Sequence, residues 1–411
     1  MLQFLKRSNL YVNALLIFYF LLLYHSILVG TSYYTLIFCV VVLFVVPMNK
    51  RLDGLGVWLI VFSILYAFLI IILGISSNHI PLYLIAPLSF YSFGRYITNQ
   101  LVSRRLILEF ISVTVFLFSA VTYYTCIVDV GNTGLINPTR IMGRTGVDDY
   151  DMAATLYGLN VSLGLACLFG FLSIEKNERT LLHYLLPISF ALSILTTVHL
   201  VNRTGLVLAF CSLLVFLFYS KKSSKATWII VIIVAVVLAY LSTKSDFTSI
   251  MEAYTSREET EGHGLSDAGS RTEKWMDALS RLFISPFGWY KDIDYSFTHN
   301  MWLDVARLTG IIPFIAIAGA TIAGYKDTIR LCRIKNDYLI LTLISILLVF
   351  FLECFVEPVI EGFDLYFYLM CMFFGIQRQY IKQITAVQRN FYHNVSCSTA
   401  SASGTLTGSV G

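Results

Sequence analysis

Long apolar runs separated by short polar segments extend over most of the chain. A membrane-spanning helix needs roughly 20 apolar residues, with about 17–25 tolerated. Most of the runs meet this requirement, and only the second and the last are short. They lie near residues 10–29, 33–48, 56–75, 80–98, 106–127, 152–173, 181–201, 204–220, 226–243, 301–324, 338–356 and 363–377. The pattern predicts an all-α, polytopic membrane bundle of about 12 transmembrane helices, with both chain ends on one side.

Two polar segments stand apart from this pattern. Residues 244–300 form the one long loop between apolar runs on the outer side, and residues 390–411 are rich in Ser, Thr and Gly without apolar periodicity. Segments of the second kind bury too little apolar surface to offset the entropy of folding. We therefore expect a membrane bundle over residues 1–389, including the loop, and a disordered cytoplasmic tail over 390–411.

Composition supports a membrane protein and excludes several other classes. Hydrophobic residues make up 57% of the 411 and charged residues 13%, against about half and about a quarter in soluble domains. The net charge of +4 is too small to indicate nucleic-acid binding. The eight cysteines are scattered without a CxxC pair, and no DxD-type acidic pair stands out as a metal ligand, so we expect no disulfide framework, no metal and no cofactor.

The basic residues fix the predicted orientation. Of 29 lysines and arginines, 19 fall in loops assigned to one face, which the positive-inside rule makes cytoplasmic. The remaining ten cluster in a few outer loops. Basic residues on the outer side oppose the positive-inside rule, so their presence there indicates a function such as binding an anion. They are Arg140, Arg144, Arg203, Arg307 and six residues of the 244–300 loop. That loop holds ten acidic residues, so particular arginines would hold the anion.

Within the loop, Arg271 to Phe283 has the periodicity of an amphipathic helix, with Trp275, Leu279 and Leu282 on one face. We expect this helix to lie along the membrane surface with its apolar side down. Pro286 ends it, and Gly288 permits a sharp turn.

His299 and Asn300 follow this turn, directly before the next apolar run. One interpretation of His299 is structural, with a ring that bonds a backbone carbonyl where the helix begins. The other is chemical, because histidine exchanges protons near neutral pH. The sequence leaves both open.

Two arginines have a similar pair of interpretations. Arg203 stands in a tight hairpin before an apolar span, and Arg271 begins the amphipathic helix. Each is either a charge that reaches toward water or a planar set of donors for a lipid pyrophosphate. Asn300, Arg140 and Arg144 are further candidates for substrate binding.

Simple ion pairing is the favoured interpretation for other charged positions. Arg140 and Arg144 precede three aspartates, with which they are expected to form salt bridges, and Asp304 and Arg307 are expected to pair on one helix. Four acids near Pro358 either face a sugar-filled cavity or neutralise arginines. They are Glu353, Glu357, Glu361 and Asp364.

Three ordered motifs resemble those of the O-antigen ligase and polymerase superfamily. They are Asn202-Arg203-Thr204-Gly205, then Ser270-Arg271 with Trp275, Pro286 and Gly288, then His299-Asn300 with Leu303 and Gly310. The resemblance implies a GT-C-like membrane glycosyltransferase in the bacterial inner membrane, with its active site on the periplasmic side. Its donor would be an undecaprenyl-pyrophosphate-linked oligosaccharide. Arg203 and Arg271 would bind the pyrophosphate, and His299 would be the catalytic residue.

The expected reaction transfers a glycan to a sugar hydroxyl with inversion and without a metal. Thr298 and Met301 flank the His-Asn pair, where ligases of the superfamily often carry a second His or an acid. We therefore expect an O-antigen polymerase, whose partners would include membrane lipid and a chain-length regulator. The alternatives are an O-antigen ligase acting on lipid A core and, from another class, a flippase for lipid-linked oligosaccharide.

Overall fold

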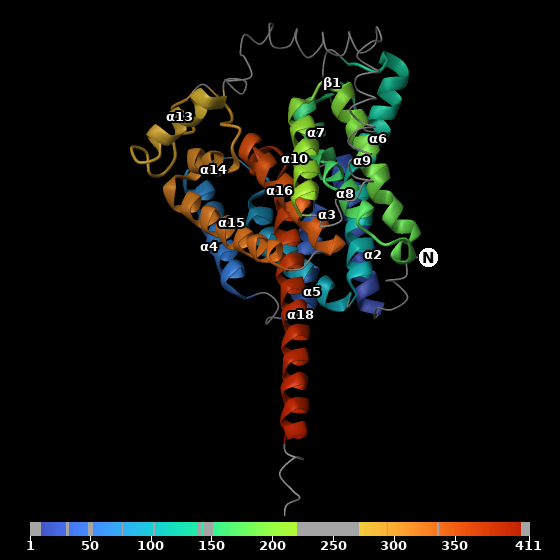
Figure 1. Cartoon of the computed structure of the whole chain (residues 1–411). Helices are drawn as coiled ribbons and strands as arrows, with labels where there is room; N and C mark the ends of the chain where they lie inside the picture. The colour runs from blue at the N-terminus through green and yellow to red at the C-terminus, as the bar shows by residue number, and fades with distance from the viewer. Residues whose placement is uncertain are drawn as a thin grey trace, which may run out of the picture.

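The computed structural model describes residues 10–29, 33–47, 52–75, 77–101, 103–137, 141–143, 151–219, 271–293, 295–334 and 337–403. Over these residues the chain is helical, apart from a short antiparallel pair of strands that joins Ile141 to Ala153 (Figure 1). The predicted run at 226–243 and the loop residues 244–270 lie outside the described residues.

The first half of the described chain contains eight α-helices, two 3-10 helices and two strands. In order they are α2 (Leu10–Val29), α3 (Tyr33–Val45), α4 (Gly54–Ile72), α5 (Ile80–Gln100), α6 (Arg104–Thr133), β1 (Ile141–Gly143), β2 (Asp151–Ala153), α7 (Ala154–Leu165), α8 (Leu168–Leu172), η2 (Lys176–Glu178), η3 (Leu181–Tyr184) and α9 (Leu185–His199). The second half contains α10 (Arg203–Tyr219), α13 (Arg271–Arg281), α14 (Met301–Thr309), α15 (Ile311–Cys332), α16 (Tyr338–Val356), α17 (Val359–Gly362) and α18 (Asp364–Ser403).

Five helical segments among the described residues are long and apolar enough to cross a membrane. They are Gly54–Ile72, Arg104–Thr133, Ala154–Leu172, Leu181–His199 and Tyr338–Val356. Shorter apolar helices cover Leu10–Tyr24, Tyr33–Val45 and Arg203–Tyr219. The chain is therefore a multi-pass, all-helical membrane protein in its broad class.

Helices α5 and α18 pack closely at the centre of the bundle. Two glycines permit this approach, because a Cβ on Gly94 would lie 2.1 Å from the Met372 carbonyl oxygen and one on Gly375 would lie 2.2 Å from that of Tyr91. Small residues at a crossing allow helix backbones to come together in lipid, where van der Waals packing replaces the hydrophobic driving force. Both helices are buried over this contact.

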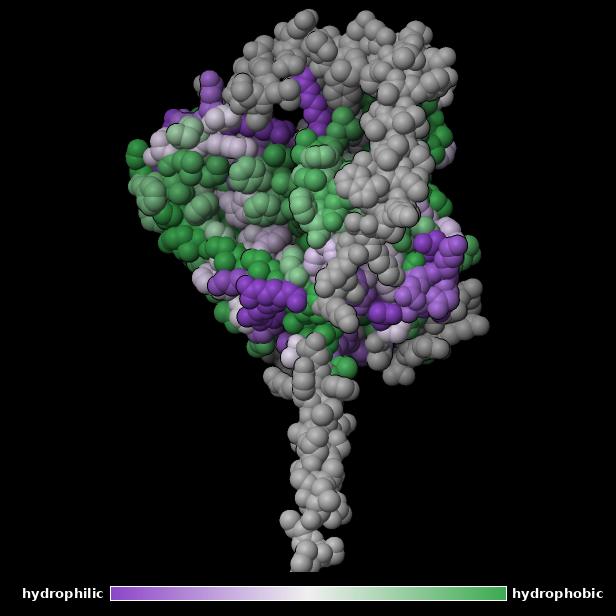
Figure 2. All heavy atoms as spheres, in the orientation of Figure 1, coloured by the Kyte–Doolittle hydropathy of each residue, from purple (hydrophilic) through white to green (hydrophobic). Residues whose placement is uncertain are grey.

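Many large apolar side chains point away from the bundle, as lipid contact requires. Figure 2 shows a broad hydrophobic surface over the side formed by α4 and α15, with a hydrophilic patch below it near the end of α15. The exposed side chains on these two helices include Val57, Val61, Ile64, Phe68, Ile312, Ile315, Ile322 and Ile329. In water, such a surface would be a large aggregation-prone patch, whereas in a bilayer it is solvated.

The structure differs from the sequence prediction at the C-terminus. Helix α18 continues to Ser403, through most of the tail that was predicted to be disordered, and it extends well beyond the bundle in Figure 1. Adding a residue to an existing helix costs far less than nucleating one. The buried first half of α18 supplies that nucleus, which the polar composition of the tail does not reveal.

Candidate active site

The His-Asn turn is held from inside the protein by Asp304. The backbone N–H of Thr298 donates to Oδ1 of Asp304 at 2.6 Å, and its hydroxyl donates to the same oxygen at 2.9 Å. The N–H of Asn300 donates to Oδ2 at 3.2 Å. Asp304 is buried, so these hydrogen bonds fix a turn that would otherwise leave its amides without partners.

Asn300 has a positioning role in this turn. Its Oδ1 accepts from the N–H of Leu303 at 3.2 Å, which makes it the N-cap of α14. Its Nδ2 donates to the carbonyl oxygen of Phe355 at 3.2 Å, which ties the turn to the end of α16. The side chain predicted as a candidate for substrate binding is therefore buried and occupied by structural hydrogen bonds.

This turn presents the ring of His299 to one carboxylate. Nδ1 of His299 lies 3.5 Å from Oε2 of Glu357, and neither atom has a hydrogen-bond partner among the described residues. The side chain of His299 is 28% exposed, whereas that of Glu357 is 5% exposed. Buried polar atoms without partners are rare in folded proteins and mark places that water or a ligand completes.

The amphipathic helix brings Arg271 to the same carboxylate. The helix is confirmed as α13, and Nη2 of its first residue donates to Oε1 of Glu357 at 2.9 Å. Trp275, one turn later, donates from Nε1 to the Thr298 carbonyl oxygen at 2.9 Å. The second and third sequence motifs therefore meet, and Glu357 joins them. Its acidic side chain in an apolar stretch was visible in the sequence, but its partners were not.

The buried face of α13 differs from the prediction by one position. Ala278 and Leu282 are buried with Trp275 against α14, while Leu279 is 48% exposed. Met276 and Phe283 are also exposed, at 64% and 78%. The helix thus has one apolar side on the protein, where Ala278 takes the inward position, and a second apolar side that is exposed.

A second group of ion pairs is connected to the His-Asn turn through Asp304. Nη2 of Arg307 lies 2.5 Å from Oε2 of Glu361, and its Nε lies 3.6 Å from Oδ1 of Asp304. The predicted pair of Asp304 and Arg307 is confirmed, and Glu361 is an additional member. Burial raises the pKa of Glu361 to about 8, against the opposing effect of the Arg307 guanidinium.

Three of the four acids near Pro358 thus pair with basic side chains. Glu357 pairs with Arg271, Glu361 with Arg307, and Asp364 with His79 at 2.9 Å. The sequence left open whether these acids face a sugar-filled cavity or neutralise arginines. The observed contacts correspond to neutralisation of nearby basic side chains. Glu353 lies one turn before Glu357 on α16 and is buried.

Arg203 begins α10, directly after a strained turn. Val201 has a φ of 50°, and the side chain of Asn202 accepts from the N–H of Gly205 at 3.3 Å. His199, fully buried before this turn, lies 2.7 Å from Asp129 through Nε2 and 3.0 Å from the Leu135 carbonyl oxygen through Nδ1. Sequence reasoning missed the His199–Asp129 pair because the two residues are 70 positions apart.

Helix packing places Arg203 at the same end of the bundle as Glu357. Helix α10 packs along α16. The hydroxyl of Tyr219, the last residue of α10, donates to the carbonyl oxygens of Leu331 and Ile334 at 3.1 and 2.8 Å, beside the start of α16. The two helices therefore run in opposite directions, and the start of α10 lies beside the end of α16 that leads to Glu357 (Figure 1). The three motifs share one end of the molecule, and direct contacts join the second and third.

Backbone strain occurs directly before the first of these motifs and within the third. Among the described residues other than glycine, positive φ occurs at Val201 and at His299, where φ is 57°. A β-branched residue rarely adopts this conformation, and such strain is often kept at functional sites. Glycine supplies positive φ at Gly288 and Gly310, where the loop and α14 pack together.

Arg140 and Arg144 fall outside the described residues, so their predicted salt bridges are untested. Over the described part of the chain, no group of three or more His, Cys, Asp or Glu residues is arranged to hold a metal ion. Comparison of the sequence with protein-family models and with curated proteins gives no match.

Proposed function

We propose that the chain is a membrane glycosyltransferase that transfers a glycan from a polyprenyl pyrophosphate to a sugar hydroxyl. The observation that carries this proposal is the convergence of Arg271 and His299 on Glu357. The guanidinium of Arg271 can bind an oxyanion, and the imidazole of His299 can accept a proton. The two groups meet at one end of a membrane bundle. Transfer from a lipid-linked pyrophosphate to a sugar hydroxyl needs a cationic group and a base together near the membrane surface.

Arg271 would bind the donor's pyrophosphate. Guanidinium groups match phosphate oxygens in pairs, as they match carboxylate oxygens, so the pyrophosphate would accept from the N–H groups of Arg271 that Glu357 leaves unused. Arg203 would add positive charge from the neighbouring helix. The side chain of Arg271 is 18% exposed, which leaves part of its guanidinium open to a ligand.

His299 would accept the proton of the attacking hydroxyl. The acceptor oxygen forms a bond to the anomeric carbon while the bond from that carbon to the pyrophosphate oxygen breaks. The electron pair leaves with the pyrophosphate, whose charge the arginines stabilise. Attack from the opposite side inverts the anomeric configuration. Glu357, facing Nδ1, would keep a proton on that nitrogen and leave Nε2 as the base.

The proposal extends to the membrane arrangement. We propose about twelve spans, made from the five long apolar helices, the shorter apolar helices, the more polar α5, α15 and first half of α18, and the predicted run at 226–243. In this arrangement the basic ends of α15 and α18 face the cytoplasm of a bacterial inner membrane. The candidate active site then faces the periplasm, where lipid-linked repeat units are displayed.

Within this reaction class we propose a polymerase of surface polysaccharide. The acceptor would be a second lipid-linked repeat unit, and the distinction rests on Thr298 and Met301 beside the His-Asn pair. Both are buried, so neither offers an additional catalytic group to the site.

The test is polysaccharide display in cells that lack the chromosomal gene and carry a plasmid copy. Arg271→Ala and His299→Ala should abolish the ladder of polymer lengths at unchanged protein level, and Arg281→Ala should preserve it. Arg281 is a matched control because it ends the same helix and pairs with Asp277 away from Glu357. Single repeats on the lipid core would identify a polymerase, and long chains retained on the carrier lipid a ligase. A normal ladder from both site variants would refute the proposal.

A further inference from the structure

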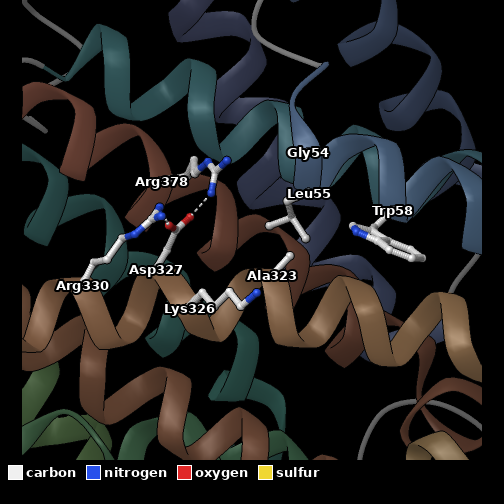
Figure 3. A pocket seen from close by; sticks show the side chains of 8 residues that line it. All are labelled: Gly54, Leu55, Trp58, Ala323, Lys326, Asp327, Arg330 and Arg378. Atoms are coloured by element: carbon white, nitrogen blue, oxygen red, sulfur yellow. Dashed lines mark hydrogen bonds and ion pairs between the residues drawn. The ribbon is translucent and has the colours of Figure 1, made fainter.

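A pocket lies at the opposite end of the molecule from the candidate active site. It has a volume of about 190 Å³ and is formed by α4, α15 and α18 (Figure 3). Its lining comprises Gly54, Leu55, Trp58, Ala323, Lys326, Asp327, Arg330 and Arg378. In Figure 3, α15 supplies one side of the pocket, while Leu55 and Trp58 of α4 supply the other.

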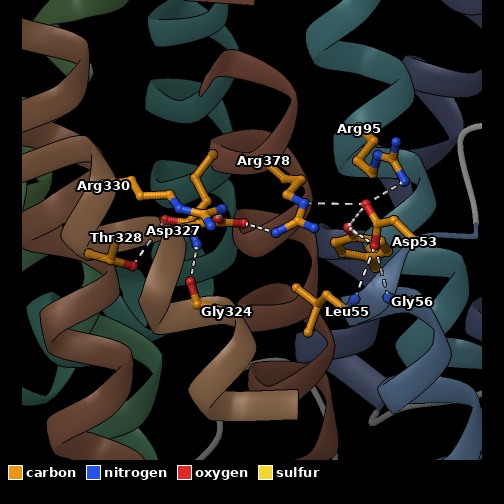
Figure 4. A network of polar contacts seen from close by, with 11 residues as sticks. Asp53, Leu55, Gly56, Arg95, Gly324, Asp327, Thr328, Arg330 and Arg378 are labelled. Atoms are coloured by element: carbon orange, nitrogen blue, oxygen red, sulfur yellow. Dashed lines mark hydrogen bonds and ion pairs between the residues drawn. The ribbon is translucent and has the colours of Figure 1, made fainter. Parts of the chain in front are cut away.

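The polar side of the pocket is built from a rigid charged network (Figure 4). Asp327, which is 1% exposed, receives Arg330 at 2.8 Å and also forms an ion pair with Arg378. Arg378 reaches Oδ2 of Asp53 at 3.3 Å, and Arg95 reaches the same oxygen at 2.9 Å. The buried Asp327 and the partly buried Asp53 therefore hold Arg378 from two sides, while the side chain of Arg330 remains 63% exposed.

This network leaves an excess of positive charge at the pocket. Its two carboxylates face three arginines, and Lys326 adds a fourth cation that forms no ion pair with any described residue. Each arginine also has five N–H donors, of which the acids use only some. An anion with several acceptor oxygens, such as a phosphate group, matches this arrangement.

The surroundings of the pocket favour a lipid as the source of that phosphate. Leu55, Trp58 and Ala323 give the pocket an apolar wall, and Ile322 and Ile329 are exposed beside it on α15. Figure 2 shows the corresponding boundary between the hydrophobic surface and the hydrophilic patch. Tryptophan favours such interfaces, and basic pockets between helices on the cytoplasmic side suit anionic headgroups.

We infer that the pocket between α4, α15 and α18 binds the phosphate group of an anionic phospholipid from the leaflet opposite the candidate active site. Lys326 and Arg330 contact the phosphate, Arg378 completes the cationic side, and the acyl chains follow the apolar surface of α4 and α15. Binding there links α18 to α15 through a ligand as well as through Asp327. This inference is independent of the proposed glycosyl transfer.

The test is equilibrium binding of dansyl-phosphatidylglycerol to the full-length protein in a neutral detergent. The double variant Lys326→Gln/Arg330→Gln should raise the Kd about thirtyfold, because each basic side chain at an anionic lipid contributes roughly fivefold. Arg333→Gln is the matched control and should change the Kd less than about twofold, because Arg333 is exposed at the end of the same helix outside the pocket. Equal binding by all three proteins would overturn the inference.

Two further measurements separate the pocket and the lipid from simpler explanations. Ala323→Leu fills the cavity without changing any charge, so it should weaken binding about tenfold. Unchanged binding in that variant would show that surface charge alone attracts the lipid. Unlabelled phosphatidylglycerol should displace the probe, whereas phosphatidylcholine and inorganic phosphate should not. Displacement by inorganic phosphate at comparable concentration would overturn the assignment to a lipid.

Discussion

Arg271 and Glu357, 86 positions apart in the chain, form an ion pair of 2.9 Å at the end of a membrane helix. The acid is almost fully buried, and its second oxygen faces the ring of His299. In the proposed reaction, a carboxylate in this position would hold the group that binds the phosphate and the group that accepts the proton in one place before any substrate arrives. Such preorganisation lowers the cost of assembling a reactive geometry.

Glu357→Gln should lower glycosyl transfer by about tenfold or more while leaving the protein folded. The amide keeps the size of the side chain and still accepts from Arg271, but it no longer carries the charge that stabilises a protonated His299. Initial rates of polymer formation at equal amounts of folded protein measure this effect. An unchanged rate would show that Glu357 is purely structural.

Trp275→Phe should loosen α13 from the His-Asn turn. The variant keeps an aromatic ring against Phe355, whose centroid lies 5.0 Å away, but it loses the hydrogen bond to Thr298. A hydrogen bond of this kind contributes about 1 kcal/mol, so donor affinity should fall about fivefold. Titration of activity with donor concentration measures the change in KM. Met276→Leu, an exposed substitution on the same helix, should leave KM unchanged, and equal effects of both would contradict the assigned role.

Gly310→Ala should destabilise the region that carries the site. Gly310 has a φ of 85°, and a Cβ there would lie 1.9 Å from the Pro286 carbonyl oxygen. Strain and overlap together should cost about 2–4 kcal/mol and lower the amount of folded protein. Gly131→Ala provides the control, because nothing lies within 4 Å of a Cβ at that position. Thermal unfolding in detergent compares the two, and equal melting temperatures would disprove the tight contact.

The His79–Asp364 pair should make stability depend on pH. Its hydrogen bond raises the pKa of His79 above the usual 6.5, so the folded protein holds this proton to a higher pH than the unfolded chain does. The stabilisation is complete below pH 6.5 and is lost as pH rises through the folded pKa. His79 is 39% exposed, so the effect on Tm should be only about 1–2 °C. His79→Gln should remove this dependence, and an unchanged pH profile would refute it.

The sequence predicted the helical class, α13 and the residues of the His-Asn turn because each depends on local pattern. The apolar periodicity of a helix and the N-cap residue Asn300 are features of residues that are neighbours in the sequence. The partners of Arg271 and His299 were not predictable, because Glu357 belongs to a distant helix. The pairing of His199 with Asp129 depends in the same way on how α6 and α9 pack. The helical extension of α18 to Ser403 was missed because composition does not show what precedes a tail.

The most direct test uses purified full-length protein, a synthetic polyprenyl-pyrophosphate-linked repeat unit and an acceptor repeat unit. Release of polyprenyl pyrophosphate and growth of the glycan are measured together in single-turnover conditions. We expect His299→Ala to lower the rate by about 10²–10⁴-fold while donor binding persists, and Arg271→Ala to lower donor binding itself. Wild-type rates from both variants, under conditions where the wild-type protein is active, would contradict the convergence of these two side chains as the catalytic arrangement.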